Sequence, residues 1–313
     1  MPDVPEPDSA VTAPGATRAA NANDAADAAN EVRGFLTSRR ARLSPEQVGL
    51  TAGGERRVPG LRREEVAQLA GVSPDYYTRL ERGRIQGASD SVLTALSEAL
   101  RLDDVERAYL FALAHGPLAA EPVPREQREQ SGTASVGSIL QYVTTPALAV
   151  SVSQDIMAAN LLGRALYSSA YDAMERPNLA RLAFEHQWDE VAGAFYGENL
   201  EQARSLIAAM MRMEAARQPG ADDLISLIKE LEQTSADFRD AWARQEVHEH
   251  RSGTKVFRHN VVGELELSYN VLTAPGVPGI GVTVYGPVPG TDAAERLAAL
   301  EEWARTQDFA TQG

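Results

Sequence analysis

The sequence predicts a multidomain protein, with an all-α domain of five helices followed by an α+β domain that holds one antiparallel sheet. Three observations support this division. Residues 116–133 carry three prolines and several charges, which is typical of a linker. Before this stretch, apolar residues recur at helical spacing, whereas several later segments alternate apolar and polar residues as half-buried strands do. A chain of 313 residues is long enough for both domains.

The all-α domain is expected over residues 31–115. Residues 1–30 are rich in Ala, Pro, Asp and Asn without a hydrophobic period, which predicts a disordered tail. A first helix is expected over residues 31–43, and a long loop follows it. Two short helices are expected over residues 63–70 and 74–82, and two more over residues 89–100 and 103–115.

The turn between the second and third of these helices is the most informative feature of the chain. Gly71 suits the left-handed residue that ends a helix, Ser73 is a good N-cap, and Pro74 suits the first helical position. This is the layout of a helix-turn-helix, whose second helix binds in the major groove of DNA; the alternative is a plain helical hairpin. With Tyr77 and Leu80 facing inward, the residues expected at double-stranded DNA are Ser73, Pro74, Asp75, Tyr76, Thr78, Arg79 and Arg82.

Charge is distributed unevenly along the chain. The net charge is −14, yet residues 33–63 hold eight arginines and only two acids. A local basic face is what contact with phosphates requires, so this stretch is expected to lie along the DNA backbone, although an arginine run can also be a solvated face. The arginines expected at phosphates are Arg56, Arg57, Arg62 and Arg63. Because one recognition helix buries too little surface to select a site, a homodimer is expected.

The second domain, residues 134–313, shows five strand-like segments at residues 147–152, 156–159, 254–262, 264–272 and 280–285. Helical stretches fill residues 160–228 and 235–245, and a last helix is expected over residues 292–305. A sheet roofed by helices is a common place for a small-molecule cavity. Core packing is the alternative for several of the residues expected to line such a cavity: Asn160, Met210, Met213, Trp242, His259, Leu267 and Tyr269.

Composition and motifs exclude several classes of site. The chain has no cysteine, which rules out disulfides and thiolate metal sites. No apolar run approaches the ~20 residues that span a bilayer, and no signal peptide is evident, so a cytoplasmic protein without membrane contact is expected. His248, His250 and His259 suggest a metal, but arginines adjoin them and spacing fixes no third ligand. Neither a nucleophile elbow nor a nucleotide-binding loop is present, so no enzyme activity and no cofactor are expected.

Two resemblances add to these expectations. The runs VAQLAGVS (residues 66–73) and LERG (residues 80–83) resemble the lambda-repressor/Cro-like (XRE-type) helix-turn-helix family. The runs TPALAVSVSQDIMAAN (residues 145–160) and RSGTKVFRHNVVGELELSYNVL (residues 251–272) resemble the ligand-binding domain of MmyB-like transcription regulators, and the whole likeness covers roughly residues 31–305. It implies a PAS-like sensor domain with a lipid-like or small apolar ligand. The leading hypothesis is therefore a transcription regulator that senses an apolar small molecule; the alternative is a regulator whose second domain docks a protein partner.

Overall fold

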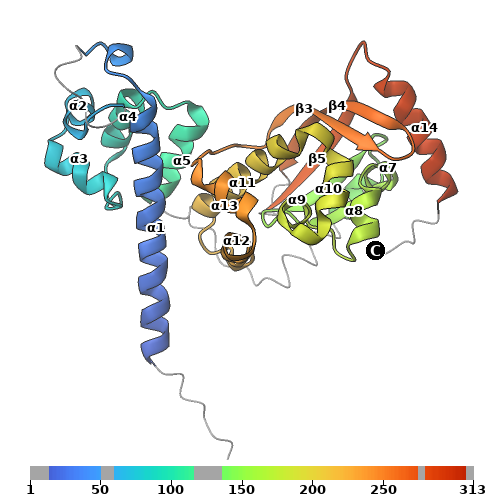
Figure 1. The fold of residues 1–313 in the computed structure, drawn as a ribbon, viewed down its shortest axis with the longest axis horizontal. Coiled ribbons are helices and arrows are strands. Elements are labelled where there is room, and N and C mark those ends of the chain that lie inside the picture. Colours follow the sequence, from blue (N-terminus) through green and yellow to red (C-terminus); the bar gives the residue numbers. More distant parts are fainter. Residues whose placement is uncertain (1–13, 51–59, 116–135, 274–278, 308–313) are drawn as a thin grey trace, which may run out of the picture. The chain divides into compact units, whose positions relative to one another are not determined.

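The computed structural model describes residues 14–50, 60–115, 136–273 and 279–307. It divides into two units, Met1–Asp103 and Asp104–Gly313. The first unit is helical and the second holds helices and a sheet (Figure 1).

The first unit contains helices α1 (Pro14–Arg42), α2 (Arg63–Leu69), α3 (Pro74–Glu81) and α4 (Asp90–Ala99), with a short 3-10 turn at Glu46–Val48. The later part of α1 lies beside α3 (Figure 1). Gly83, at the end of α3, has a φ of 93°, and a Cβ there would lie 2.5 Å from the Cα of Ala29 in α1. Only glycine fits this close approach. The core of the unit consists of buried apolar residues, among them Phe35, Leu36, Val66, Tyr77, Leu80, Leu93 and Leu96.

The start of α1 differs from the sequence-based expectation. Residues 14–30 belong to this helix, where a disordered tail was expected, so the helix begins at Pro14 and not at residue 31. The physical reason is composition, because alanine is the strongest helix former and this stretch is rich in it. A missing hydrophobic period shows only that no helix face has to be buried. Residues 1–13 lie outside the described residues.

All five helices expected over residues 31–115 are present. The fifth, α5 (Asp104–His115), falls in the second unit, where it packs against helix α11 (Leu200–Arg217). The structure thus divides the chain at Asp103, whereas the sequence places the domain end at residue 115 and a linker at residues 116–133. That linker lies outside the described residues, so these domain limits stay a prediction.

The second unit holds one five-stranded antiparallel sheet, as expected. Its strands are β1 (Ala147–Ser151), β2 (Ile156–Ala159), β3 (Ser252–His259), β4 (Gly263–Thr273) and β5 (Ile280–Pro287), in the order β2-β1-β5-β4-β3. The alternation predicted for β4 is confirmed, because Leu265, Leu267 and Tyr269 are buried while Glu264 and Glu266 are exposed.

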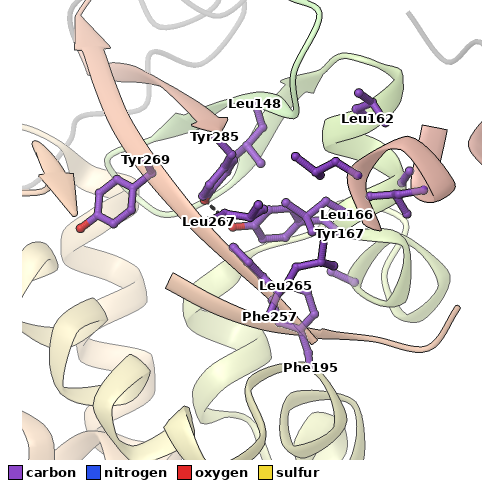
Figure 2. Packing of buried hydrophobic residues seen from close by; sticks show 14 of the residues in the cluster. Leu148, Leu162, Leu166, Tyr167, Phe195, Phe257, Leu265, Leu267, Tyr269 and Tyr285 are labelled. Atoms are coloured by element: carbon purple, nitrogen blue, oxygen red, sulfur yellow. Dashed lines mark hydrogen bonds between the residues drawn. The ribbon is translucent and has the colours of Figure 1, made fainter. Parts of the chain in front are cut away.

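The helices of this unit are α7 (Leu161–Leu166), α8 (Ser168–Ala173), α9 (Leu179–Phe184), α10 (Asp189–Tyr196), α11, α12 (Asp222–Thr234), α13 (Ala236–Ala243) and α14 (Ala293–Thr306). Helices α7, α10 and α14 pack directly on the sheet, while α11 packs mainly against α9 and α13. The core under the sheet is aromatic. Tyr167 and Tyr285 share a buried hydrogen bond of 2.7 Å between their hydroxyls, and Phe195 and Phe257 pack around Tyr167 (Figure 2).

Within the described part of the chain, no helix combines the length and the apolar character that crossing a bilayer requires.

Candidate functional site

The turn between α2 and α3 has the predicted geometry. Gly71 is left-handed, with a φ of 64°. The Ser73 hydroxyl accepts a hydrogen bond of 3.2 Å from the Tyr76 amide, and Pro74 opens α3. Because a cap and a fixed φ both stabilise the first turn, the start of α3 is held in one orientation.

The outward face of α3 carries the residues expected to contact DNA. Tyr77 and Leu80 point into the core, as predicted. Ser73, Pro74, Asp75, Arg79 and Arg82 are exposed, and Tyr76 and Thr78 are half-buried. Among the described residues, Arg79 and Arg82 form no ion pair or side-chain hydrogen bond. Their guanidinium groups are thus available for the bidentate contacts that arginine makes with guanine and phosphate.

The inward face of α3 is held by a buried carboxylate that the sequence did not reveal. Glu81 is 1% exposed and accepts a hydrogen bond of 2.7 Å from Arg40 Nε of α1. It also forms an ion pair with Arg63 of α2, and the Tyr77 hydroxyl donates to it at 3.3 Å. Arg40 in turn donates to the Leu61 carbonyl at 2.7 Å. One carboxylate therefore ties α3 to both neighbouring helices.

This network includes one of the four arginines predicted to contact phosphates. Arg63 is committed to Glu81, although its side chain is half exposed. The Arg62 amide donates to Glu65 Oε2 at 2.7 Å, which caps α2. Arg56 and Arg57 lie outside the described residues. The phosphate role of these four arginines stays a prediction.

A cavity of about 810 Å³ lies in the second unit, between the sheet and α11. This volume is in the range of small-molecule sites. Its apolar wall comes from the strands and from α11. Because α11 packs mainly on other helices and not on the sheet, space remains between this helix and the strands. Residues of this wall include Leu148, Val150, Val271, Ala203, Leu206, Ile207 and Met210.

Two of the seven residues expected at a ligand, Met210 and Tyr269, are on the cavity wall. Tyr269 stands apart from the other labelled rings, with its hydroxyl directed away from the Tyr167–Tyr285 pair (Figure 2). The other five do not line this cavity. Leu267 is fully buried in the core under the sheet. Met213 is fully buried as well.

Trp242, His259 and Asn160 are the remaining three, and their ligand role stays a prediction. Trp242 stacks on Phe238, with Arg212 Cζ 3.9 Å from its ring centroid. His259 is 6% exposed; its Nε2 lies 3.0 Å from the Ala165 carbonyl, and its Nδ1 accepts from the Val261 amide. The Asn160 side chain caps α7 and ties the start of β1 to the residues before it.

One end of the cavity is polar, and none of the residues predicted at a ligand other than Tyr269 belongs to it. The segment before β3 brings His248, Glu249 and His250 to the wall, and Lys255 of β3 joins them. Lys255 Nζ lies 3.5 Å from His250 Nε2 and 4.8 Å from the centroid of the Tyr269 ring. The His250 ring stacks on Tyr269 with centroids 4.3 Å apart.

The charges at this end are unevenly compensated. Glu249 accepts from Arg217 at 3.1 Å and forms an ion pair of 2.7 Å with Arg251. Burial alone would raise the pKa of Glu249, but the two arginines outweigh it and the pKa is lowered. Among the described residues, no carboxylate pairs with Lys255, and His248 Nε2 and His250 Nδ1 are buried without a hydrogen-bond partner. Buried polar atoms of this kind are uncommon in proteins and mark a place where a polar ligand group fits.

Burial also sets the protonation of this cluster. It lowers the pKa of Lys255 to about 8. Burial, with the nearby charges of Lys255 and His248, lowers the pKa of His250 to about 2, so this imidazole is neutral near pH 7. Burial is also the largest cause that lowers the pKa of His248. The only sequence signal for Lys255 is rarity, since it is one of two lysines in a chain whose other cations are arginines. No group of three or more His, Asp or Glu side chains within the described residues could hold a metal ion.

Comparison with protein families gives two matches. Residues 31–110 match the model of a helix-turn-helix domain. Residues 133–300 match the model of the MmyB-like transcription regulator ligand binding domain, which covers more than half of the chain. No curated protein sequence matches the chain.

Proposed function

Since this chain belongs to the MmyB-like transcription regulators, we propose that it selects an operator through the outward face of α3 and senses a mostly apolar small molecule in the cavity of its second domain. It is a DNA-binding transcription regulator, and its helix-turn-helix is the part that binds DNA. The observation that carries the proposal is the pairing, in one chain, of two features: a helix whose outward arginines, Arg79 and Arg82, form no ion pair among the described residues, and a domain with a cavity of about 810 Å³.

The architecture of the second domain supports a sensor role. Its single antiparallel sheet, in the order β2-β1-β5-β4-β3, and the helices packed on it support the PAS-like fold that the resemblance implies. The apolar wall would hold a ligand by burial, and a few polar groups would fix its orientation. A ligand can change DNA affinity only if it prefers one state of the protein, with coupling typically about 1–3 kcal/mol. We propose that the ligand changes DNA affinity by altering the expected dimer interface.

Arg79→Ala and Tyr76→Ala are each expected to weaken operator binding by about 1–3 kcal/mol and to relax sequence preference, because each removes one base contact. Gel-shift titration on operator and on unrelated DNA measures both effects. Arg33→Ala is the matched control, since it removes one exposed arginine of α1 from the same unit and should leave sequence preference unchanged. Unaltered preference in both α3 variants would show that this face does not bind bases.

Ala203→Phe is expected to empty the cavity of a co-purifying molecule, because Ala203 lines it from α11 and a larger side chain there takes up its volume. Native mass spectrometry of the full chain detects such a molecule in the wild type. Arg79→Ala is the reciprocal control: it should keep the molecule and lose sequence preference, whereas Ala203→Phe should lose the molecule and keep sequence preference. If neither the wild type nor Arg79→Ala carries a small molecule, the docking of a protein partner becomes the better explanation of the second domain.

A further inference from the structure

The cavity contains an amine in an unusual position. Lys255 lies on the cavity wall, partly buried, beside apolar groups and the face of Tyr269. A lysine in such surroundings would normally pair with a carboxylate, because burying an isolated ammonium is costly. The nearest segment does supply an acid, Glu249, but Arg217 and Arg251 both hold it. Within the described residues, no acidic side chain forms an ion pair with Lys255.

The choice of residue is informative as well. Of the 30 lysines and arginines in the chain, only Lys229 and Lys255 are lysines. Arginine would provide a cation to an anionic ligand equally well, with five N–H donors in a planar group. What arginine cannot provide is a neutral, nucleophilic nitrogen, because its guanidinium is not deprotonated in proteins. At Lys255, burial lowers the pKa to about 8, so a substantial fraction of the amine is neutral slightly above physiological pH.

A neutral imidazole lies next to this amine. His250 Nε2 is 3.5 Å from Lys255 Nζ, and stacking on Tyr269 fixes the plane of its ring. Its other nitrogen, Nδ1, has no hydrogen-bond partner within the described part of the chain. The imidazole remains neutral near pH 7, because burial and the adjacent cations disfavour its charged form. The imidazole therefore adds no positive charge beside Lys255, and the amine can lie next to it in its neutral, nucleophilic form.

We propose that Lys255 binds an apolar aldehyde or ketone covalently, as an imine, beside the imidazole of His250. This inference rests on the proposed function of the cavity and names the chemical class of its ligand. Neutral Nζ attacks the carbonyl carbon and forms a C–N bond. One proton then moves from the nitrogen to the oxygen and gives a carbinolamine. The second N–H proton follows to the hydroxyl, which leaves as water while the C=N bond forms. No oxidant or reductant takes part, and hydrolysis by water reverses the reaction.

The test uses the full chain with decanal and cyanoborohydride, which reduces an imine to a stable amine. Peptide mass spectrometry then compares labelling at Lys255 with labelling at Lys229, an exposed lysine of α12 that serves as an internal control. We expect Lys255 to react about tenfold faster or more, because an exposed lysine is almost fully protonated near pH 7.5. Excess decanol, which has the same chain but no carbonyl, should suppress labelling at Lys255 and not at Lys229.

Two variants sharpen the result. Lys255→Arg keeps the cation and should carry no label above that of Lys229, while Lys229→Arg should keep the label at Lys255. Equal labelling of both lysines, or labelling at Lys255 that decanol does not suppress, would overturn the imine. Native mass spectrometry with decanol separates this failure from that of the cavity itself. If decanol binds and Lys255 is not labelled preferentially, only the imine is wrong; if neither compound binds, the small-molecule role of the cavity fails too.

Discussion

Replacing Glu81 with alanine should destabilise the first unit by about 3–5 kcal/mol, since a buried cation is left without its partner. Glu81 is 1% exposed and Arg40, its partner in α1, has a side chain 10% exposed. After the substitution, the Arg40 guanidinium keeps only the Leu61 carbonyl among the contacts described above, and the Tyr77 hydroxyl loses its acceptor. Operator binding should fall with the folded fraction, although Glu81 is buried inside the unit.

Amide hydrogen exchange in the full chain measures this effect locally. Opening of α2 and α3 should become more frequent by about two to three powers of ten, at 1.4 kcal/mol for each tenfold change. Helices α11 to α13, in the second unit, should exchange as in the wild type. These helices therefore report whether the loss is confined to the first unit.

Arg63→Ala is the matched control for the same carboxylate. The Arg63 side chain is 50% exposed, and a solvated ion pair is worth about 1 kcal/mol or less. We expect exchange in α3 to change little, while Glu81 keeps Arg40. An Arg63→Ala variant as unstable as Glu81→Ala would show that both arginines hold the helix equally, contrary to the burial argument.

The helix-turn-helix could be predicted from local sequence, because its signals are local. A left-handed glycine, a serine cap and a proline in succession specify the turn between α2 and α3, and the structure has all three. The sheet could also be predicted, since the alternation in β4 identifies its buried face. The burial of Glu81 could not be predicted from local sequence, because an acidic residue among charged neighbours is typical of an exposed helix face. Only the packing of α1 across α3 buries it.

The ligand site could be predicted only in outline. Period and composition show which residues are buried, and they do not show whether a buried residue faces another side chain or a cavity. Leu267 and Tyr269 lie on the same face of β4, yet the first is core and the second reaches the cavity wall. The difference depends on where α11 stands off the sheet, which is a property of the tertiary packing. Lys255 gave no periodic signal for the same reason.

Asn160→Ala is expected to destabilise the second unit by about 3 kcal/mol or more, through four backbone groups that lose their partner. The Asn160 side chain donates to the Val143 and Thr145 carbonyls, both at 2.7 Å. Its oxygen accepts from the Ala147 amide at 3.0 Å and from the Gly163 amide at 2.7 Å. It thereby joins the chain before β1 to the first turn of α7. Each of these groups is difficult to hydrate in place, because α7 lies directly against β1.

That close packing is visible at Gly163, where a Cβ would lie 2.2 Å from the Ala147 carbonyl oxygen. Urea unfolding of the full chain, followed by tryptophan fluorescence, measures the loss, because all three tryptophans lie in the second unit. Asn199→Ala is the matched control: Asn199 precedes α11, lines the cavity, is exposed, and makes no capping hydrogen bond with its side chain. It should leave the unfolding midpoint nearly unchanged.

The two substitutions also separate a structural role from ligand contact. If Asn160 only holds the backbone, the folded fraction of Asn160→Ala should bind decanol as the wild type does, measured well below the unfolding midpoint. If Asn160 contacts the ligand, affinity should fall in folded protein while stability changes little. The four short hydrogen bonds to backbone favour the first result, since they use both amide protons and the oxygen and leave no donor for a ligand.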